Sequence, residues 1–234
     1  MAAIRSASWR RTAGDPALLG AVVGVWVLLL LFVLFPMAHL LERAFVDDGR
    51  FTLAPLLESL ADPSHRAAFV NSLVLATSVG VCGTALGFLF ALTAARGGLG
   101  RHWLTFLDAA ALLPLVSPPF TTSISIIFSF GPKGFITHDL LGLANASVYG
   151  FWSTALAETL TYFPIAYLTL RPILAAIDPN LEEMALSLGG SRWRTFRTVT
   201  LPLAVPGFAN SFLLLFAASL ADFATPLILA GNSF

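Results

Sequence analysis

The sequence predicts an all-α integral membrane protein, and two observations carry this prediction. Of the 234 residues, 57% are hydrophobic and only 11% are charged, whereas a soluble domain carries about 25% charged residues. Uncharged runs of 23 to 29 residues recur along the chain, and about 20 apolar residues let one helix cross a bilayer. The formal net charge of zero argues against a nucleic-acid partner. The single cysteine, Cys82, excludes an internal disulfide and a four-cysteine zinc site.

The N-terminal part combines a basic leader with a first span. Residues 1–16 contain three arginines, and the 25 residues of Ala17–Leu41 carry no formal charge. This run is longer than the apolar core of a cleavable signal peptide, which has roughly 7–15 residues. We therefore expect an uncleaved first span over residues 17–43, followed by a loop with a short surface helix.

The second span is expected at Ala67–Ala95, where 29 residues lack a formal charge. It contains the pair Gly83 and Gly87, whose spacing is typical of helices that pack closely in membranes. The first span contains the same spacing at Gly20 and Gly24. Such spacings predict helix packing and say nothing about a substrate.

The third span is expected from about Trp103 to Phe130, and its prolines predict that it is kinked or interrupted. Freed carbonyl groups in a membrane are tolerated only against protein or a watery cavity. The break is therefore either a packing kink or part of a transport pathway. The candidates for this role are Pro114, Pro118 and Pro119.

Two acidic residues fall in or beside the remaining spans. The fourth span is expected from Tyr149 to Leu170 and contains Glu158; the fifth is expected at Val199–Ala221, directly before Asp222. A carboxylate at such depth is costly and should face the interior of the helix bundle. Glu158 and Asp222 are therefore candidates for lining a pathway, and a structural hydrogen bond is the alternative. We expect Asp108, Glu158 and Asp222 to be too far apart to form a carboxylate pair.

The distribution of basic residues predicts the orientation. If the N-terminus is cytoplasmic, nine of the 13 arginines and lysines face the cytoplasm and four face outward. Because basic residues concentrate on the cytoplasmic side, the segment between the fourth and fifth spans is expected there.

That segment, Asp178–Pro202, is a polar interruption that reads as two short amphipathic helices joined at Gly189-Gly190. Asp178 is expected to cap the first helix and Ser191 the second. One apolar stripe is expected along the first helix. It consists of Leu181, Met184, Ala185 and Leu188.

The spacing within this segment resembles the EAA loop of bacterial ATP-binding-cassette (ABC) importer permeases. The family pattern is Glu-Ala-Ala, three residues, Gly, nine residues, then Ile-x-Leu-Pro. Here Glu183-Met-Ala185, Gly189 and Val199-x-Leu201-Pro202 stand at the same offsets, with Met184 and Val199 as mild replacements. The resemblance covers residues 65–234.

This resemblance implies a type I importer transmembrane domain with five visible spans and a coupling loop at 171–201. It also implies a bacterial inner-membrane location, a separate dimer of ATPase subunits, a second permease half and a periplasmic solute-binding protein. No cofactor, metal or catalytic residue is expected. The residues implied in ATPase coupling are Glu183, Ala185, Gly189, Leu181, Met184, Leu188, Leu201 and Pro202.

The substrate is a separate question. Three runs look like iron(III) importer permeases, a branch in which two permease halves are commonly fused; they begin at Leu113, Phe130 and Ala221. The chain is therefore expected to be a first half, or a fragment, with a sixth span missing. Phosphonate, thiamine, polyamine and sulfate remain alternative substrates.

A membrane enzyme and an ATP-independent transporter are the two alternatives to the importer. The sequence contains no Gly-x-x-x-x-Gly-Lys-Ser/Thr phosphate loop, so we do not expect the chain to hydrolyse ATP. It also lacks the His-Glu-x-x-His and Gly-x-Ser-x-Gly motifs of membrane hydrolases. An ATP-independent channel or carrier remains the rival interpretation.

Overall fold

The computed structural model describes residues 16–47, 50–143 and 147–231. The chain divides into two compact units, Met1–Arg66 and Ala67–Phe234, each of which is described by itself. The predicted basic leader lies almost entirely outside the described residues.

The first unit contains a long helix whose side chains are exposed throughout its apolar length. Pro16–Phe45 is 30 residues long and includes a π-helical stretch. A β-hairpin of two antiparallel two-residue strands follows it, and a short helix comes next in the sequence. The hairpin was not predicted, whereas the short helix was. The elements are α2 (Pro16–Leu29), η1 (Leu30–Leu34), α3 (Phe35–Phe45), β1 (Val46–Asp47), β2 (Arg50–Phe51) and α4 (Ala54–Ala61).

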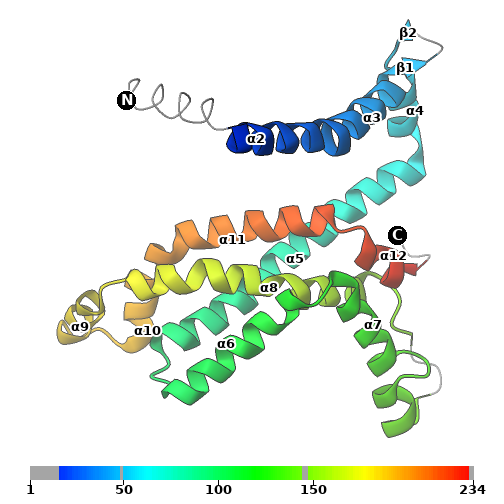
Figure 1. Ribbon diagram of the computed structural model, residues 1–234. Coiled ribbons are helices and arrows are strands. Elements are labelled where there is room, and N and C mark those ends of the chain that lie inside the picture. The colour runs from blue at the N-terminus through cyan, green and yellow to red at the C-terminus, as the bar shows by residue number, and fades with distance from the viewer. Residues whose placement is uncertain (1–15, 48–49, 144–146, 232–234) are drawn as a thin grey trace. The chain divides into compact units, whose positions relative to one another are not determined.

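The second unit is a bundle of helices built around α8 (Figure 1). Helix α11 packs along α8, and α5, α6 and α7 supply the other neighbours of the buried core. The elements are α5 (Pro63–Arg96), α6 (Arg101–Val116), α7 (Pro119–Phe130), η2 (Phe135–Leu140), α8 (Phe151–Ala176), α9 (Pro179–Ser187), α10 (Arg192–Thr195), η3 (Phe196–Thr200), α11 (Leu201–Ala221) and α12 (Ala224–Leu229).

Three helices of the described chain are long and apolar enough to cross a membrane: Pro16–Phe45, Pro63–Arg96 and Arg192–Ala221. Two bent pairs raise this number to five if each pair is one span. The predicted all-α membrane architecture is therefore confirmed, and the described helices allow up to five spans. The third predicted span is broken rather than continuous, because α6 and the segment after it meet at 104°.

Glycines on α5 let neighbouring helices approach closely. A Cβ atom at Gly87 would lie 2.8 Å from the Tyr167 nitrogen and 2.9 Å from the Phe163 oxygen, both on α8. Gly83 lies directly against Leu215 of α11. The packing predicted from this spacing is therefore confirmed on α5. By contrast, a Cβ atom at Gly20 or Gly24 meets no described atom within 4 Å, so that pair makes no such contact here.

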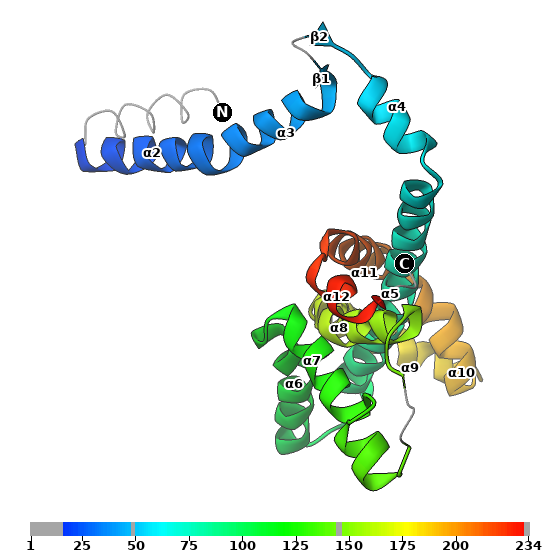
Figure 2. The same ribbon diagram turned by 90° about the vertical axis from the view of Figure 1, so that its right-hand side faces the viewer.

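Short α12 closes the opposite end of the bundle from α9. It lies against α7 and α8 (Figure 2), and the Gly150 N–H at the start of α8 donates to the Leu229 carbonyl at 2.7 Å. The Asp222 carboxylate caps α12 by accepting from the Ala224 and Thr225 N–H groups. The chain after the fifth predicted span therefore folds back onto the bundle.

Candidate functional site

The segment between α8 and α11 begins with the capped helix that the sequence predicts. The Asp178 carboxylate accepts from the Asn180 N–H at 2.9 Å, and Pro179 occupies the first turn of α9. Proline suits this position because its missing N–H would have no partner there. Helix α9 therefore starts at a defined residue, directly after α8 ends.

The predicted apolar stripe of α9 is largely exposed. Leu181, Met184 and Leu188 have exposed fractions of 45%, 62% and 87%. Ala185, the fourth member, is half-buried, and its carbonyl accepts from the Gly190 N–H at 3.1 Å. Large apolar side chains gathered on one exposed face are typical of a surface that binds another protein or a membrane.

The turn after α9 depends on Gly189. Its φ angle is +84°, a left-handed conformation that a glycine adopts without the steric cost of a Cβ atom. The predicted second cap is also present, since the Ser191 hydroxyl accepts from the Arg194 N–H at 3.2 Å. The two caps and the glycine turn thus produce a tight helical hairpin.

The second half of the segment differs from the prediction. We expected a separate short helix and a span beginning at Val199, but Arg192–Ala221 is one helix of 30 residues. It passes through the π-helical turn η3, and Leu201 and Pro202 form the first turn of α11. The expected loop start is also different, because Arg171–Ala176 belongs to α8. The hairpin is therefore directly continuous with a spanning helix.

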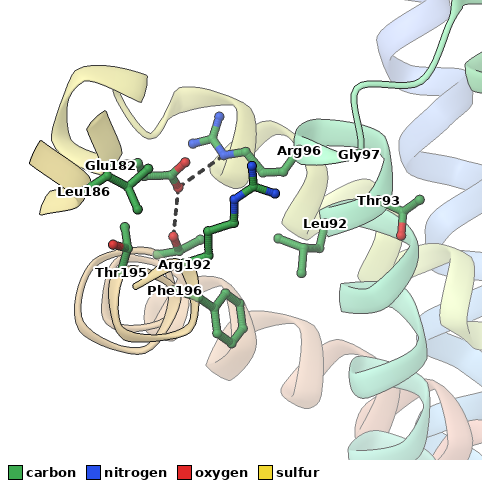
Figure 3. Close-up of a pocket in the computed structure, with 10 residues that line it drawn as sticks. Leu92, Thr93, Arg96, Gly97, Glu182, Leu186, Arg192, Thr195 and Phe196 are labelled. Atoms are coloured by element: carbon green, nitrogen blue, oxygen red, sulfur yellow. Dashed lines mark hydrogen bonds and ion pairs between the residues drawn. The ribbon is translucent and has the colours of Figure 1, made fainter. Parts of the chain in front are cut away.

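Sequence reasoning missed the acidic residue that contacts both the end of α5 and the residue before α11. The Glu182 carboxylate lies 3.2 Å from Arg96 Nε at the end of α5 (Figure 3). It also accepts from the Thr200 hydroxyl at 2.8 Å. Neighbouring Glu183, the motif position, is exposed and forms no hydrogen bond or ion pair with the described residues. No local pattern links residues 86 positions apart, so the sequence offered no signal for this contact.

A pocket of about 580 Å³ lies beside these contacts. Its walls come from α5, α9 and the start of the Arg192–Ala221 helix, and they combine apolar side chains with two arginines (Figure 3). The lining residues are Leu92, Thr93, Arg96, Gly97, Glu182, Leu186, Arg192, Thr195, Phe196 and Thr200.

The three prolines mark the break in the third predicted span. Pro114 lies inside α6, Pro118 precedes α7, and Pro119 is in the first turn of α7. The predicted interruption is therefore present. A proline at the start of α7 is compatible with a new helix, whereas Pro114 removes a hydrogen bond from the last turns of α6.

Glu158 and Asp222 lie on adjacent turns of the interface between α8 and α11. Fully buried Glu158 accepts from the Ser219 hydroxyl, and the Tyr162 hydroxyl donates to Asp222 at 3.0 Å. Each carboxylate therefore accepts a hydrogen bond from a hydroxyl group across this interface. The two hydrogen bonds lie about one turn apart, because Tyr162 follows Glu158 by one turn, as Asp222 follows Ser219. Asp108 belongs to a different group, with Tyr167 and Arg171.

The chain resembles known transport permeases in sequence. It is 32% identical to the ferric transport system permease protein FbpB of Actinobacillus pleuropneumoniae, over 94% of this chain and 32% of that protein. The chain thus spans about a third of the length of this relative. It is also 32% identical to the molybdenum transport system permease protein ModB of Escherichia coli K12, over 74% of this chain and 75% of ModB.

The fold is shared with a solved transporter. The crystal structure of a bacterial ABC transporter involved in the import of the acidic polysaccharide alginate matches 96% of this chain and 81% of that chain. The TM-score is 0.74 at 18% sequence identity, so this likeness concerns the fold. Residues 83–234, which contain the entire hairpin, match the family described as binding-protein-dependent transport system inner membrane component. The chain therefore belongs to this family of ABC importer permeases.

Proposed function

We propose that the chain is the membrane-spanning part of an ATP-driven importer and that the 178–202 hairpin couples it to a separate ATPase subunit. The observation that carries this proposal is the exposed apolar face of α9 formed by Leu181, Met184 and Leu188. A helix that presents apolar side chains at this spacing fits a groove in a partner protein. Glu183 stands exposed beside this face and is available to a polar group of the partner.

The continuity of the hairpin with α11 supports the same role. Leu201 and Pro202 lie in the first turn of α11, and the helical chain runs without a break from Arg192 to Ala221. A rigid helix transmits displacement along its length, as in the shear movements of packed helices. Movement of the hairpin would therefore reach the far side of the bundle, where Asp222 and α12 lie.

We propose ferric iron, delivered by a periplasmic binding protein, as the substrate. The similarity to the ferric permease extends over 94% of this chain, against 74% for the molybdenum permease. Pro114, Pro118, Pro119, Glu158 and Asp222 remain proposed pathway residues. The alternative substrates are molybdate, sulfate, phosphonate, thiamine and polyamines. Uptake of radioactive iron(III) in the presence of each unlabelled solute distinguishes them, because only a true substrate should reduce the uptake of the label.

A test of the coupling role uses the complete transporter, with its ATPase and binding protein, in proteoliposomes. Met184→Asp and Leu188→Asp place a charge on the apolar face and should abolish ATP-dependent iron(III) uptake, because a charge buried in an apolar groove is strongly disfavoured. Ser187→Asp is the matched control, since it adds the same charge to an exposed residue of the same helix. Equal uptake by all three variants would contradict the proposal.

A deletion distinguishes the importer from an ATP-independent channel or carrier. Removing Leu181–Gly190 should eliminate uptake in an ATPase-driven importer. If uptake persists without this segment and without any ATPase, the transporter is an ATP-independent one.

A further inference from the structure

Arg96 is the last residue of α5, and its side chain contacts two other elements. Its Nη2 donates to the Ile177 carbonyl at 3.0 Å, at the point where α8 ends, and its Nε lies 3.2 Å from Glu182 Oε1 on α9. The two side chains of the ion pair are about one-fifth exposed, at 22% and 23%. Arg96 thus joins the ends of two spanning helices to the proposed coupling helix.

Glu182 extends this connection to the next helix. The same Oε1 atom accepts from the Thr200 hydroxyl at 2.8 Å, and Thr200 is buried directly before α11 begins. A charged acceptor makes a stronger hydrogen bond than a neutral one. The Glu182 carboxylate therefore contacts Arg96 at the end of α5 and Thr200 directly before α11.

A pocket lies beside Arg96 and Glu182, and both residues line it. The pocket of about 580 Å³ separates the end of α5 from α9 and from the start of the Arg192–Ala221 helix. Close-packed apolar side chains therefore do not fill this region, and Figure 3 shows Glu182 and Arg96 meeting at its edge. Loss of the ion pair would leave room for α9 to tilt without displacing α5.

We propose that Arg96, Glu182 and Thr200 form a latch that transmits movement of α9 to α5 and α11 during transport. This inference rests on the proposed coupling function of the hairpin. Arg96 and Glu182 act as positioning residues, because neither side chain is needed to form the apolar face of α9. A partly exposed ion pair contributes little to folding stability, so its loss should affect coupling more than folding.

The test measures ATP hydrolysed per iron(III) ion imported by the complete transporter in proteoliposomes. Arg96→Ala and Glu182→Gln should raise this ratio about tenfold, within the range of typical coupling between sites. The charge exchange Arg96→Glu with Glu182→Arg should restore part of the loss. Thr200→Val, which keeps both charges, should raise the ratio in the same direction and provides the test if the charge variants fail to assemble.

Arg101→Ala is the matched control. Arg101 is the exposed first residue of α6, outside the pocket and the hairpin, and its guanidinium forms no hydrogen bond or ion pair with the described residues. This variant should keep the wild-type ratio. A wild-type ratio in the latch variants, or an equal rise in Arg101→Ala, would overturn the latch. Iron uptake by the wild type without ATP would instead overturn the proposed function.

Discussion

The Arg171 guanidinium lies 2.5 Å from the Asp108 carboxylate, and this ion pair joins α8 to α6. The Tyr167 hydroxyl donates to the same carboxylate oxygen, and the Arg171 guanidinium lies 5.6 Å from the centre of the Tyr167 ring. Arg171 is the first residue of the predicted cytoplasmic loop at 171–201, whereas the structure places it inside α8. Its partner explains how a full positive charge is accommodated within a bundle helix.

Asp108→Asn should destabilise the protein by about 2 kcal/mol, because it leaves Arg171 without a compensating charge. Removing one partner of a fully buried pair costs about 3–5 kcal/mol, and the partial exposure of both side chains reduces this penalty. Thermal unfolding of the purified permease in detergent measures the loss. Asp139→Asn, which changes an exposed carboxylate, is the control. A double variant that also replaces Arg171 by Gln should recover part of the stability.

The Glu158–Ser219 hydrogen bond should stabilise the packing of α8 against α11. Ser219→Ala should lower the free energy of unfolding by about 1 kcal/mol, the usual size of a hydrogen bond between membrane helices. Ser211→Ala on the same helix is the control, because that buried hydroxyl has no hydrogen-bond partner among the described residues. Equal losses in the two variants would show that this hydrogen bond contributes nothing specific.

Local features of the hairpin could be predicted from the sequence, whereas its long-range contacts could not. Asp178 and Ser191 cap helices within two or three residues of themselves, and the Gly189 turn is equally local. By contrast, Arg96 meets Glu182 across 86 positions, and no periodicity encodes such a pair. The continuous helix Arg192–Ala221 was missed because its first residues are basic while the remainder is apolar. Hydropathy locates the membrane boundary, and a helix can cross that boundary without ending.

The close approach of α5 to α8 predicts that Gly87 is intolerant of any side chain. Gly87→Ala should cost about 1–3 kcal/mol, the usual penalty of overpacking, because the new methyl group would meet backbone atoms of Tyr167 and Phe163. Backbone atoms of a packed helix cannot move aside as a flexible side chain can. Gly24→Ala, at the same spacing on α2, meets no described atom and should be neutral or slightly stabilising. Thermal unfolding of both variants makes the comparison, and equal effects would contradict it.

The left-handed conformation of Gly189 predicts a specific requirement for glycine in the hairpin. Gly189→Ala should strain the turn by about 1 kcal/mol and reduce ATP-dependent uptake about fivefold, because the hairpin then populates other conformations. Gly142→Ala is the matched control: Gly142 has a similar φ of +66°, and a Cβ atom there meets no described atom within 4 Å. It should lose similar stability while retaining uptake. Gly189→Asn should lie between Gly189→Ala and the wild type, since asparagine tolerates this conformation better than alanine. If uptake falls equally in the Gly189→Ala and Gly142→Ala variants, the effect is one of general stability, and the geometry of the hairpin is not what transport requires.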